Sequence, residues 1–394
     1  MELRFSSAEE AFREEVRAWI GEHLPDDWKV SNPCNDRDTR DRIDQEWDRL
    51  LYEKGWAMIS WPRQYGGMDA SLAQQLIFFE EMAKADAPKG LWQGKGLVGP
   101  TILAYGTEEQ KQRFIPPILR GDVVWCQGWS EPNAGSDLPN MKTRGRVDGD
   151  HLVVSGQKIW STWAHIADWC FALVRTSNTT PGHKGLTYVL IDMKTPGVTV
   201  RPIRQMTRDR DFGEIFFDEA RIPLHNVVGE IDKGWYAAMT TLADERTSAY
   251  FDLPLRHRRI LDQVAELAKT TLRNGRPMSQ DPIVRQKLAQ CRIEIDAFRY
   301  AVLRTVSAKM RGEEPGAESW MLKVYWTEVL QRLTTTALGI LGPYSQLLKG
   351  SERAIDQGYW PYFYLWMRSE TIAGGTSDIN RNTLAERILG MPRG

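Results

Sequence analysis

The sequence predicts an α+β protein in three parts: an N-terminal helical domain over residues 1–120, a β-sandwich or β-barrel domain over 121–230, and a C-terminal four-helix bundle over 231–394. Two periodicities carry this prediction. Apolar residues recur every three to four positions in the outer parts, as in amphipathic helices. In the middle part, short β-branched and aromatic runs alternate with Gly, Pro, Asn and Asp, as strands alternate with turns.

The N-terminal part opens with a helix expected over residues 7–25. This segment begins with a serine suited to cap a helix, followed by glutamates, and Pro25 ends it. Its apolar side chains fall at helical spacing: Phe12, Val16, Trp19 and Ile20. Further helical periods cover 41–54, 71–85 and 108–119.

The middle part carries the runs HLVVSGQKIW, WCFALVR, GLTYVLIDM, VTVRPI and EIFFDEARIP. Short apolar runs separated by frequent turns suit a sandwich or barrel and not alternating strand–helix units.

In the C-terminal part the helical period returns in long segments, and a last helix starts after Thr376. The long segments are 234–273, 282–312, 316–341 and 359–370. Long helices with short connections predict an antiparallel bundle. Pro254 is expected to kink the first of these helices.

Charge and cysteine content exclude several classes of protein. Fifty-one basic and 52 acidic residues give a formal net charge of -1, so we expect neither nucleic acid nor an anionic membrane as a partner. No window approaches about 18 consecutive apolar residues, so no membrane span or signal peptide is predicted. The cysteines show no disulfide or metal spacing, which indicates free thiols and a cytoplasmic protein: Cys34, Cys126, Cys170 and Cys291.

The common catalytic motifs are missing. The chain has no GxGxxG after a strand, no GxxxxGK[ST], no HExxH and no GxSxG, and its six histidines form no pair at metal spacing. We therefore expect no metal site. One polar turn stands out, WCQGWSEPNAGSDLPN at Trp125–Asn140. Backbone N–H groups in such a turn can bind an anion or the edge of a heterocycle, although the residues alone leave an ordinary turn as the alternative.

Three segments, in order along the chain, closely resemble marks of the acyl-CoA dehydrogenase family. They are YGTEEQK at 105–111, SEPNAGSD with MKTRGRVDGDHLVVSGQKIWST after it, and GGTSDINR at 374–381. The resemblance runs the length of the chain. It implies a flavoenzyme that uses FAD to put a 2,3-double bond into an acyl-CoA thioester, with the order of domains that periodicity predicts.

The resemblance implies a set of flavin-binding residues in the middle part. Gln127 and Trp129 would contact the isoalloxazine ring largely through backbone atoms, and Ser130 through its hydroxyl. Trp160 would pack on the flavin, and Thr162 would form a hydrogen bond near the reactive N5. A tryptophan in the core is the alternative interpretation of Trp160.

The resemblance also implies residues that contact the adenine side of FAD and the coenzyme A part of the substrate. Thr376 and Asp378 match positions beside the adenine-side phosphates and ribose of FAD, where the family more often has Gln or Glu than Asp. Ser136 would face the coenzyme A part of the substrate.

The catalytic base is not where the best-known branch of the family has it. Removing a weakly acidic α-proton calls for a carboxylate whose pKa is raised in a dry pocket. In that branch a glutamate immediately precedes Gly-Thr in the C-terminal motif, whereas this chain has Gly374. Branched-chain and long-chain members carry the glutamate on the first helix of the C-terminal bundle, and alignment from Gly234 puts Glu245 there. Asp244 is the nearest competitor.

Arg246 and Gly374 have implied supporting roles. Arg246 would fix the carboxylate or the coenzyme A side, although a nearby cation lowers a carboxylate's pKa and so works against a base. Without the resemblance, the sequence favours a solvated pair on a helix for Glu245 and Arg246. Gly374 would keep the backbone N–H that, with a ribityl hydroxyl of FAD, binds the thioester carbonyl. Each such donor stabilises the transition state that leads to the enolate by roughly 3 kcal/mol.

A second departure concerns the subunits. Homotetramers of the family bind each FAD partly through a neighbouring subunit, by Arg-x-x-Phe-Gly and Gln-x-x-Gly-Gly segments. The matching regions here read TLRNGRP at 271–277 and GILGP at 339–343, so only Arg273 or Arg276 can substitute, and Pro343 lacks an N–H. We predict a tetramer, either a heterotetramer completed by a paralogous subunit, as in members associated with steroid side-chain degradation, or a homotetramer with altered contacts.

The predicted function is FAD-dependent acyl-CoA dehydrogenation in lipid or steroid catabolism by β-oxidation. Glu245 would be the base, flavin N5 the hydride acceptor, and an electron-transfer flavoprotein the oxidant. The alternatives are a flavin monooxygenase or oxidase of the same fold, a noncatalytic partner subunit, and a purely structural helical protein. The acyl group stays open, as does the role of residues 359–364, as pocket wall or core.

Overall fold

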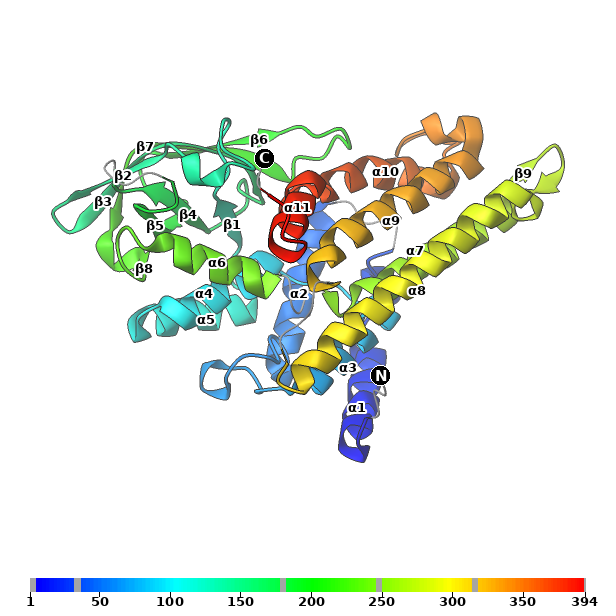
Figure 1. Ribbon diagram of the computed structural model, residues 1–394, viewed down its shortest axis with the longest axis horizontal. Helices are drawn as coiled ribbons and strands as arrows, with labels where there is room; N and C mark the ends of the chain where they lie inside the picture. Colours follow the sequence, from blue (N-terminus) through cyan, green and yellow to red (C-terminus); the bar gives the residue numbers. More distant parts are fainter. Residues whose placement is uncertain (1–4, 32–36, 178–181, 246–249, 314–317, 393–394) are drawn as a thin grey trace. The chain divides into compact units, whose positions relative to one another are not determined.

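The computed structural model describes residues 5–31, 37–177, 182–245, 250–313 and 318–392 (Figure 1). The chain forms two compact units. The helical unit comprises Met1–Asp36, Ser71–Ala87 and Tyr250–Gly394, and the sheet unit comprises Arg37–Ala70 and Pro88–Ala249. The predicted succession of helices, β-strands and helices is confirmed.

The helical unit is built on long helices that share one apolar core. Its helices are α1 (Ser7–His23), α3 (Leu72–Ala85), α7 (Leu253–Thr270), α8 (Pro282–Met310), α9 (Glu318–Leu341), α10 (Tyr359–Glu370) and α11 (Ser377–Thr383). Capping boxes start the first two, at Ser6 with Glu9 and at Ser71 with Gln74. Core residues come from all four long bundle helices, among them Val264, Phe298, Leu333 and Trp360.

The expectation of one kinked helix over 234–273 is wrong. The structure has two helices there, α6 (Gly234–Glu245) and α7, which belong to different units. Pro254 lies in the first turn of α7, where its missing N–H removes no helical hydrogen bond. The proline therefore starts a helix and does not bend one.

The sheet unit contains eight connected strands. They are β1 (Trp125–Gly128), β2 (Arg144–Asp148), β3 (His151–Thr162), β4 (Trp169–Arg175), β5 (Leu186–Asp192), β6 (Val198–Ile203), β7 (Phe212–Pro223) and β8 (Val227–Val228). Their order is β6-β7-β3-β2-β4-β5-β8, with β1 parallel to β4. Strands β2 and β4 pair only at Arg144 and Arg175, so this point joins two halves.

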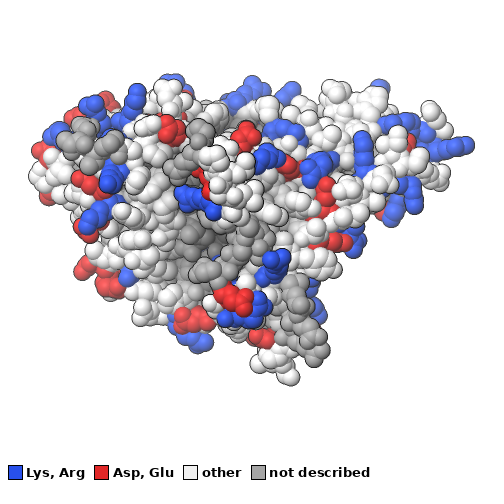
Figure 2. All heavy atoms as spheres, in the orientation of Figure 1, with Lys and Arg blue, Asp and Glu red and all other residues white. Residues whose placement is uncertain are grey.

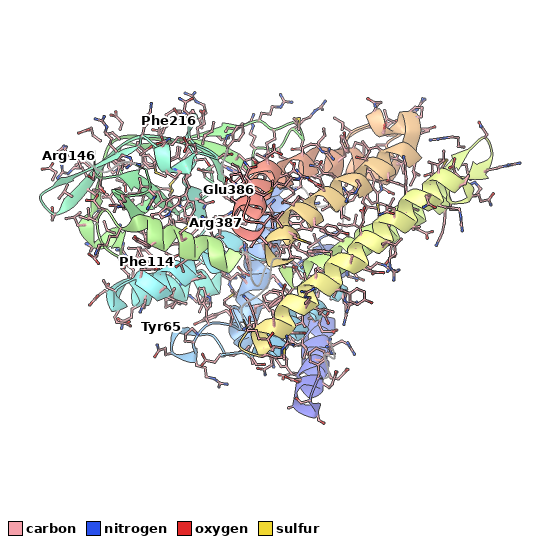
Figure 3. All side chains as sticks on the ribbon, in the orientation of Figure 1. Tyr65, Phe114, Arg146, Phe216, Glu386 and Arg387 are labelled. Carbon is pink, nitrogen blue, oxygen red and sulfur yellow. The ribbon has the colours of Figure 1, made fainter. Side chains whose placement is uncertain are left out.

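The two halves of the sheet share one core, as the predicted sandwich requires. Val154 and Ile222 of one half and Cys170 and Ile191 of the other belong to the same buried cluster. Helices α2 (Arg37–Lys54), α4 (Gly99–Tyr105), α5 (Glu108–Arg120) and α6 complete the unit. Phe114 of α5, labelled in Figure 3, packs edge-on against the rings of Trp125 and Trp169.

Shorter elements connect these. Single turns of 3₁₀ or π helix are η1 (Asp26–Trp28), η2 (Arg63–Tyr65), η3 (Gln93–Val98), η4 (Leu138–Asn140), η5 (Leu224–Asn226), η7 (Met278–Gln280), η8 (Gly342–Gln346), η9 (Ile355–Gly358) and η10 (Leu384–Ile388). A two-stranded ribbon, β9 (Leu272–Arg273) and β10 (Arg276–Pro277), joins α7 to α8.

The structure allows three expectations from the sequence to be examined: the state of the thiols, the presence of membrane-spanning helices and the distribution of surface charge. Cys126, Cys170 and Cys291 are buried free thiols, as predicted, and Cys34 lies outside the described residues. None of the helices in the described ranges combines the length and apolarity that crossing a bilayer requires. Basic and acidic side chains are interspersed over most of the face in Figure 2.

A buried charge cluster stabilises the helical unit. Glu81 of α3 is 3% exposed and accepts hydrogen bonds from Arg13 at 2.8 Å, Arg17 at 3.1 Å and Lys84 at 2.6 Å. Burial by itself would raise the pKa of Glu81, but the hydrogen bonds from Lys84, Arg13 and Arg17 outweigh it and leave the pKa below the ordinary 4.5.

We predict that Glu81→Gln lowers the free energy of unfolding by about 2 kcal/mol at neutral pH, measured by urea denaturation. Because the folded-state pKa is the lower one, the carboxylate stabilises the protein above its unfolded pKa, and this is lost as the pH falls through the folded pKa. The difference between wild type and variant should therefore narrow below pH 4.5. Glu14→Gln is the control, since the Glu14–Arg17 pair is more than half exposed. A pH-independent difference would contradict this prediction.

Candidate active site

The polar turn singled out in the sequence follows β1 directly. Gln127 pairs with Phe171 in the parallel ladder of β1 and β4. Trp129 is the first residue after β1; it is 5% exposed, and its ring lies edge-on to Phe171 and Tyr188. The side chain of Trp129 is thus core, which agrees with a ligand contact made by its backbone. Glu131 exchanges two backbone hydrogen bonds of 3.0 Å with the alanine three residues later and closes the turn.

A buried ion pair holds this turn, and sequence reasoning missed it. Lys158 of β3 is fully buried and donates to the carbonyl of Trp129 at 3.0 Å and to Oε1 of Glu131 at 2.8 Å. Burial lowers the pKa of Lys158, and the carboxylate partly offsets this. Burial would raise the pKa of Glu131, but the charge and hydrogen bond of Lys158 outweigh it, so the pKa is lowered. A lysine within the apolar run HLVVSGQKIW was the available signal.

Trp160 lies at an irregularity of β3. Its φ is +63°, and the register of β3 with β7 shifts between Lys158 and Ser161. Such a bulge re-aims side chains, and the indole of Trp160 is 58% exposed, edge-on to Phe212. The core alternative for Trp160 is therefore wrong. Thr162 ends the strand opposite Phe212.

The structure brings the turn and the Trp160 segment together. The N–H of Ile159 donates to the carbonyl of Ser130 at 2.9 Å. Ser130 is therefore bonded to the residue that immediately precedes Trp160. The Oγ of Ser161 is buried and has no hydrogen-bond partner among the described residues. An exposed aromatic ring next to a polar turn and a buried, unpaired hydroxyl among the described residues together fit a flat heterocycle such as isoalloxazine. Ser136 is exposed, farther along the same turn.

The C-terminal motif lies in the helical unit. Gly374 and Gly375 have φ of +63° and +89°, a conformation that favours glycine, and Thr376 caps α11 through its hydroxyl. Thr376 and Asp378 line a cavity of 760 Å³ together with Ser377 and the basic residues Lys287, Arg332 and Arg368.

This cavity fits a phosphorylated ligand. Nη2 of Arg368 and Oγ of Ser377 are buried, and the part of the chain that the structure describes offers neither a hydrogen-bond partner. Guanidinium and hydroxyl donors are the groups that bind phosphate oxygens. The sequence had pointed to Thr376 and Asp378 but not to Arg368 or Ser377, since cavity lining depends on how helices pack.

Only the backbone of the predicted base is described. Glu245 is the last residue of α6, while its side chain, that of Asp244 and the whole of Arg246 lie outside the described residues. One turn earlier, Thr241 is fully buried and its hydroxyl is 2.6 Å from that of Thr101 and 3.4 Å from that of Tyr188. This polar contact fixes α6 within the sheet unit.

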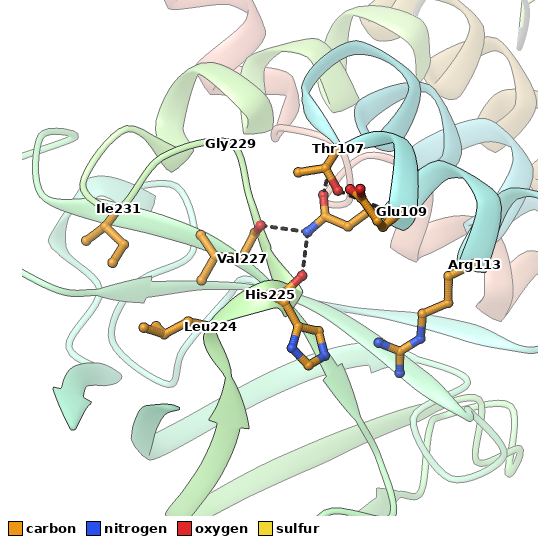
Figure 4. Close-up of a pocket in the computed structure, with 9 residues that line it drawn as sticks. Thr107, Glu109, Arg113, Leu224, His225, Val227, Gly229 and Ile231 are labelled. Atoms are coloured by element: carbon orange, nitrogen blue, oxygen red, sulfur yellow. Dashed lines mark hydrogen bonds between the residues drawn. The ribbon is translucent and has the colours of Figure 1, made fainter. Parts of the chain in front are cut away.

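A cavity of 660 Å³ elsewhere in the sheet unit lies between α5 and the segment around β8 (Figure 4). Gln110 spans its wall and donates to the carbonyls of His225 and Val227 at 2.8 and 2.7 Å. The described residues that line this cavity include none of the predicted site residues.

Comparison with known proteins identifies the family. Models of the N-terminal, middle and C-terminal domains of acyl-CoA dehydrogenases match residues 6–122, 126–220 and 232–389. Acyl-CoA dehydrogenase IpdE1 of Mycolicibacterium smegmatis is 37% identical, over 97% of each chain. The chain belongs to the acyl-CoA dehydrogenase family. It is thus an oxidoreductase, as the motifs predicted, and members of this family depend on FAD.

One further relative and two solved structures resemble the chain over 98% or more of their length. IpdE1 of Mycobacterium tuberculosis is 36% identical over 98% of each chain. The structure titled Tcur3481-Tcur3483 steroid ACAD matches with a TM-score of 0.85 and 31% identity over 100% of each chain. The ChsE4-ChsE5 complex from Mycobacterium tuberculosis matches with a TM-score of 0.85 and 29% identity, also over 100% of each chain.

The exposed indole makes a separate prediction. Trp160→Ala should leave the melting temperature of the FAD-free protein nearly unchanged, because the ring is mostly in solvent, and should weaken FAD binding about tenfold, or about 1.4 kcal/mol. Fluorescence titration of the FAD-free protein with FAD measures this. Tyr236→Ala is the matched control, since Tyr236 is 60% exposed in the same unit and should leave FAD affinity at the wild-type value. Equal affinities in all three proteins would show that Trp160 does not contact the flavin.

Proposed function

We propose that this acyl-CoA dehydrogenase is an FAD-dependent enzyme that introduces an α,β-double bond into an acyl-CoA thioester. The observation that carries the proposal is the adjacency, in the sheet unit, of the polar turn around Ser130, the exposed Trp160 and the buried hydroxyl of Ser161. We keep 1–120, 121–230 and 231–394 as the proposed domain boundaries. The cytoplasmic location stays a prediction.

The residues of the chain fit FAD in two places. Backbone groups of Gln127 and Trp129, the hydroxyl of Ser130, the indole of Trp160 and Thr162 would hold the isoalloxazine. Bound FAD supplies a hydride acceptor, and an electron-transfer flavoprotein would reoxidise it.

Thr376 and Asp378 would hold the phosphates and ribose, with the nearby guanidinium of Arg368 supplying positive charge. Ser136 and Arg246 would contact the coenzyme A moiety.

Glu245 would remove the α-proton of the thioester. The support is the resemblance to branched-chain and long-chain members, which carry the base on the first helix of the C-terminal part, and Glu245 is the last residue of the matching helix α6. A carboxylate kept from water there would have the raised pKa that a base for a weak carbon acid needs.

Gly374 would contribute its backbone N–H to the thioester carbonyl. The donor stabilises the enolate oxygen as negative charge develops, which lowers the barrier for proton removal. The positive φ of Gly374 also explains why a side chain at this position would be strained.

We also propose that a paralogous subunit completes the FAD site in a heterotetramer. Arg273, one of the two arginines that could substitute in contacting a neighbour's FAD, donates instead to the carbonyl of Gly339 in its own chain at 2.9 Å. Pro343 offers no N–H at the second conserved segment. Two similar solved structures are named as pairs of different chains, and one of them as a steroid enzyme, which supports a steroid-derived substrate in lipid or steroid catabolism.

Anaerobic titration of the yellow protein with straight, branched and steroid-derived acyl-CoA thioesters tests the function. One class should bleach the flavin stoichiometrically and yield the α,β-unsaturated thioester. Intact flavin absorbance with every thioester would contradict the proposal. Rapid oxygen consumption during turnover would instead indicate the oxidase or monooxygenase alternative.

A further inference from the structure

The buried ammonium group of Lys158 donates hydrogen bonds to the turn that, in the proposed function, contacts the flavin. The ammonium group donates to the carbonyl of Trp129, to Oε1 of Glu131 and, at 3.7 Å, to Sδ of Met141. Glu131, whose carboxylate pairs with it, is itself 8% exposed. That carboxylate also accepts the backbone N–H groups of Lys142 at 2.6 Å and Thr143 at 2.8 Å. One buried charge therefore connects β3, the turn and the segment leading into β2.

Stability alone is a poor explanation for this pair. Taking two charges out of water is costly, and well-packed apolar residues are often as stabilising as a buried ion pair. What an apolar side chain cannot do is donate a hydrogen bond to the carbonyl of Trp129. The effect specific to Lys158 is thus the orientation of one peptide group.

The geometry of the peptide bond transmits that orientation. The described residues contain no cis peptide bond, so the carbonyl of Trp129 and the N–H of Ser130 lie in one plane and point in opposite directions. Because Lys158 holds the carbonyl toward the interior, the N–H of Ser130 points away from it. The next carbonyl, that of Ser130, is bound to the N–H of Ile159, so both peptide groups around Ser130 are fixed.

The irregularity in β3 lets this strand bury Lys158 and expose Trp160. In a regular strand, residues two apart face the same side, so Lys158 and Trp160 would both be buried or both exposed. The register shift and the positive φ of Trp160 separate them: the ammonium is 0% exposed and the indole 58% exposed.

We propose that Lys158 is a positioning residue for the flavin, which acts by holding the Trp129 carbonyl inward so that the N–H of Ser130 faces the ring edge. The proposal rests on the proposed function, since it requires FAD at this turn. Lys158 touches neither ligand in this role, and Glu131 keeps its charge compensated.

The test is the double variant Lys158→Met/Glu131→Gln in the full-length chain, in the assembly that holds FAD in the wild type. It removes both charges together, and the Gln oxygen still accepts the N–H of Thr143. The matched control is Asp48→Asn/Lys95→Met, which neutralises another buried pair of the same unit, 0% and 3% exposed, that joins α2 to η3 and includes no residue of the turn. Melting temperature without FAD, FAD dissociation constant, and the absorbance and midpoint potential of bound flavin are measured for each protein.

We expect the Lys158 variant to fold but to bind FAD at least about tenfold more weakly, with altered flavin absorbance and potential, while the control keeps wild-type values. If this variant has the wild-type FAD affinity and flavin spectrum, the inference about Lys158 is overturned while the proposed function stands. A wild-type protein that takes up no FAD would overturn the proposed function and the inference with it.

Hydrogen exchange of the wild type gives the same decision if the variant does not fold. The amide of Ser130 should exchange more slowly once FAD is added, and equal exchange with and without FAD would overturn the inference.

Discussion

Glu245→Gln should slow the anaerobic reduction of bound flavin by a saturated acyl-CoA roughly 10³-fold while leaving FAD content and thioester binding near wild type. A positioned general base contributes about 10²–10⁴-fold to a proton transfer, and an amide of the same shape cannot accept the proton. Stopped-flow absorbance under anaerobic conditions measures the rate, and equilibrium titration measures binding.

Asp244→Asn is the matched control for that result. Neighbouring residues on a helix differ by about 100° in direction, so only one of Asp244 and Glu245 can face the substrate. The Asp244 variant should therefore reduce its flavin at close to the wild-type rate. A slow Asp244 variant beside a normal Glu245 variant would show that the base is Asp244.

The chain produced alone should retain much less than one FAD per chain, and production together with its paralogous subunit should restore full occupancy in a heterotetramer. The physical reason is that the two segments by which homotetramers complete a neighbour's FAD site are replaced here, and Arg273 is engaged within its own helical unit. Size-exclusion chromatography with mass analysis and flavin absorbance gives the assembly and the FAD content.

The reverse substitution sharpens this prediction. Gly339→Gln/Pro343→Gly rebuilds the Gln-x-x-Gly-Gly pattern, and a Cβ at Gly339 meets no atom within 4 Å, so the helical unit accommodates it. FAD retention by the chain alone should rise in this variant. A wild-type homotetramer that already holds four FAD molecules would refute the heterotetramer.

Local periodicity predicted most of the fold, because element type depends mainly on neighbouring residues. The apolar spacing of α1 and α8 and the β-branched runs of β4 and β5 each indicated the element that forms. The break between α6 and α7 escaped prediction. Pro254 has the same local signature whether it kinks a helix or begins one, and tertiary packing decides between these outcomes.

The candidate site was predictable in part. The motifs singled out the turn around Ser130 and the segment around Trp160, and the structure places the two beside each other. The Lys158–Glu131 pair depends on a contact between residues 27 positions apart, which periodicity does not report. The outward direction of Trp160 depends on a bulge, which strand alternation does not foresee. The role of Glu245 stays a prediction, because its side chain lies outside the described residues.

The central claim, that a carboxylate at the end of α6 takes the α-proton in place of the one missing at position 374, is tested most directly by hydrogen exchange at the substrate. A 3-thia acyl-CoA analogue can lose an α-proton but has no β-hydride to transfer, so incubation in deuterium oxide isolates the proton step. Mass spectrometry should show deuterium entering the α-position with the wild-type enzyme and not with Glu245→Gln. Incorporation at the wild-type rate by Glu245→Gln would contradict the claim.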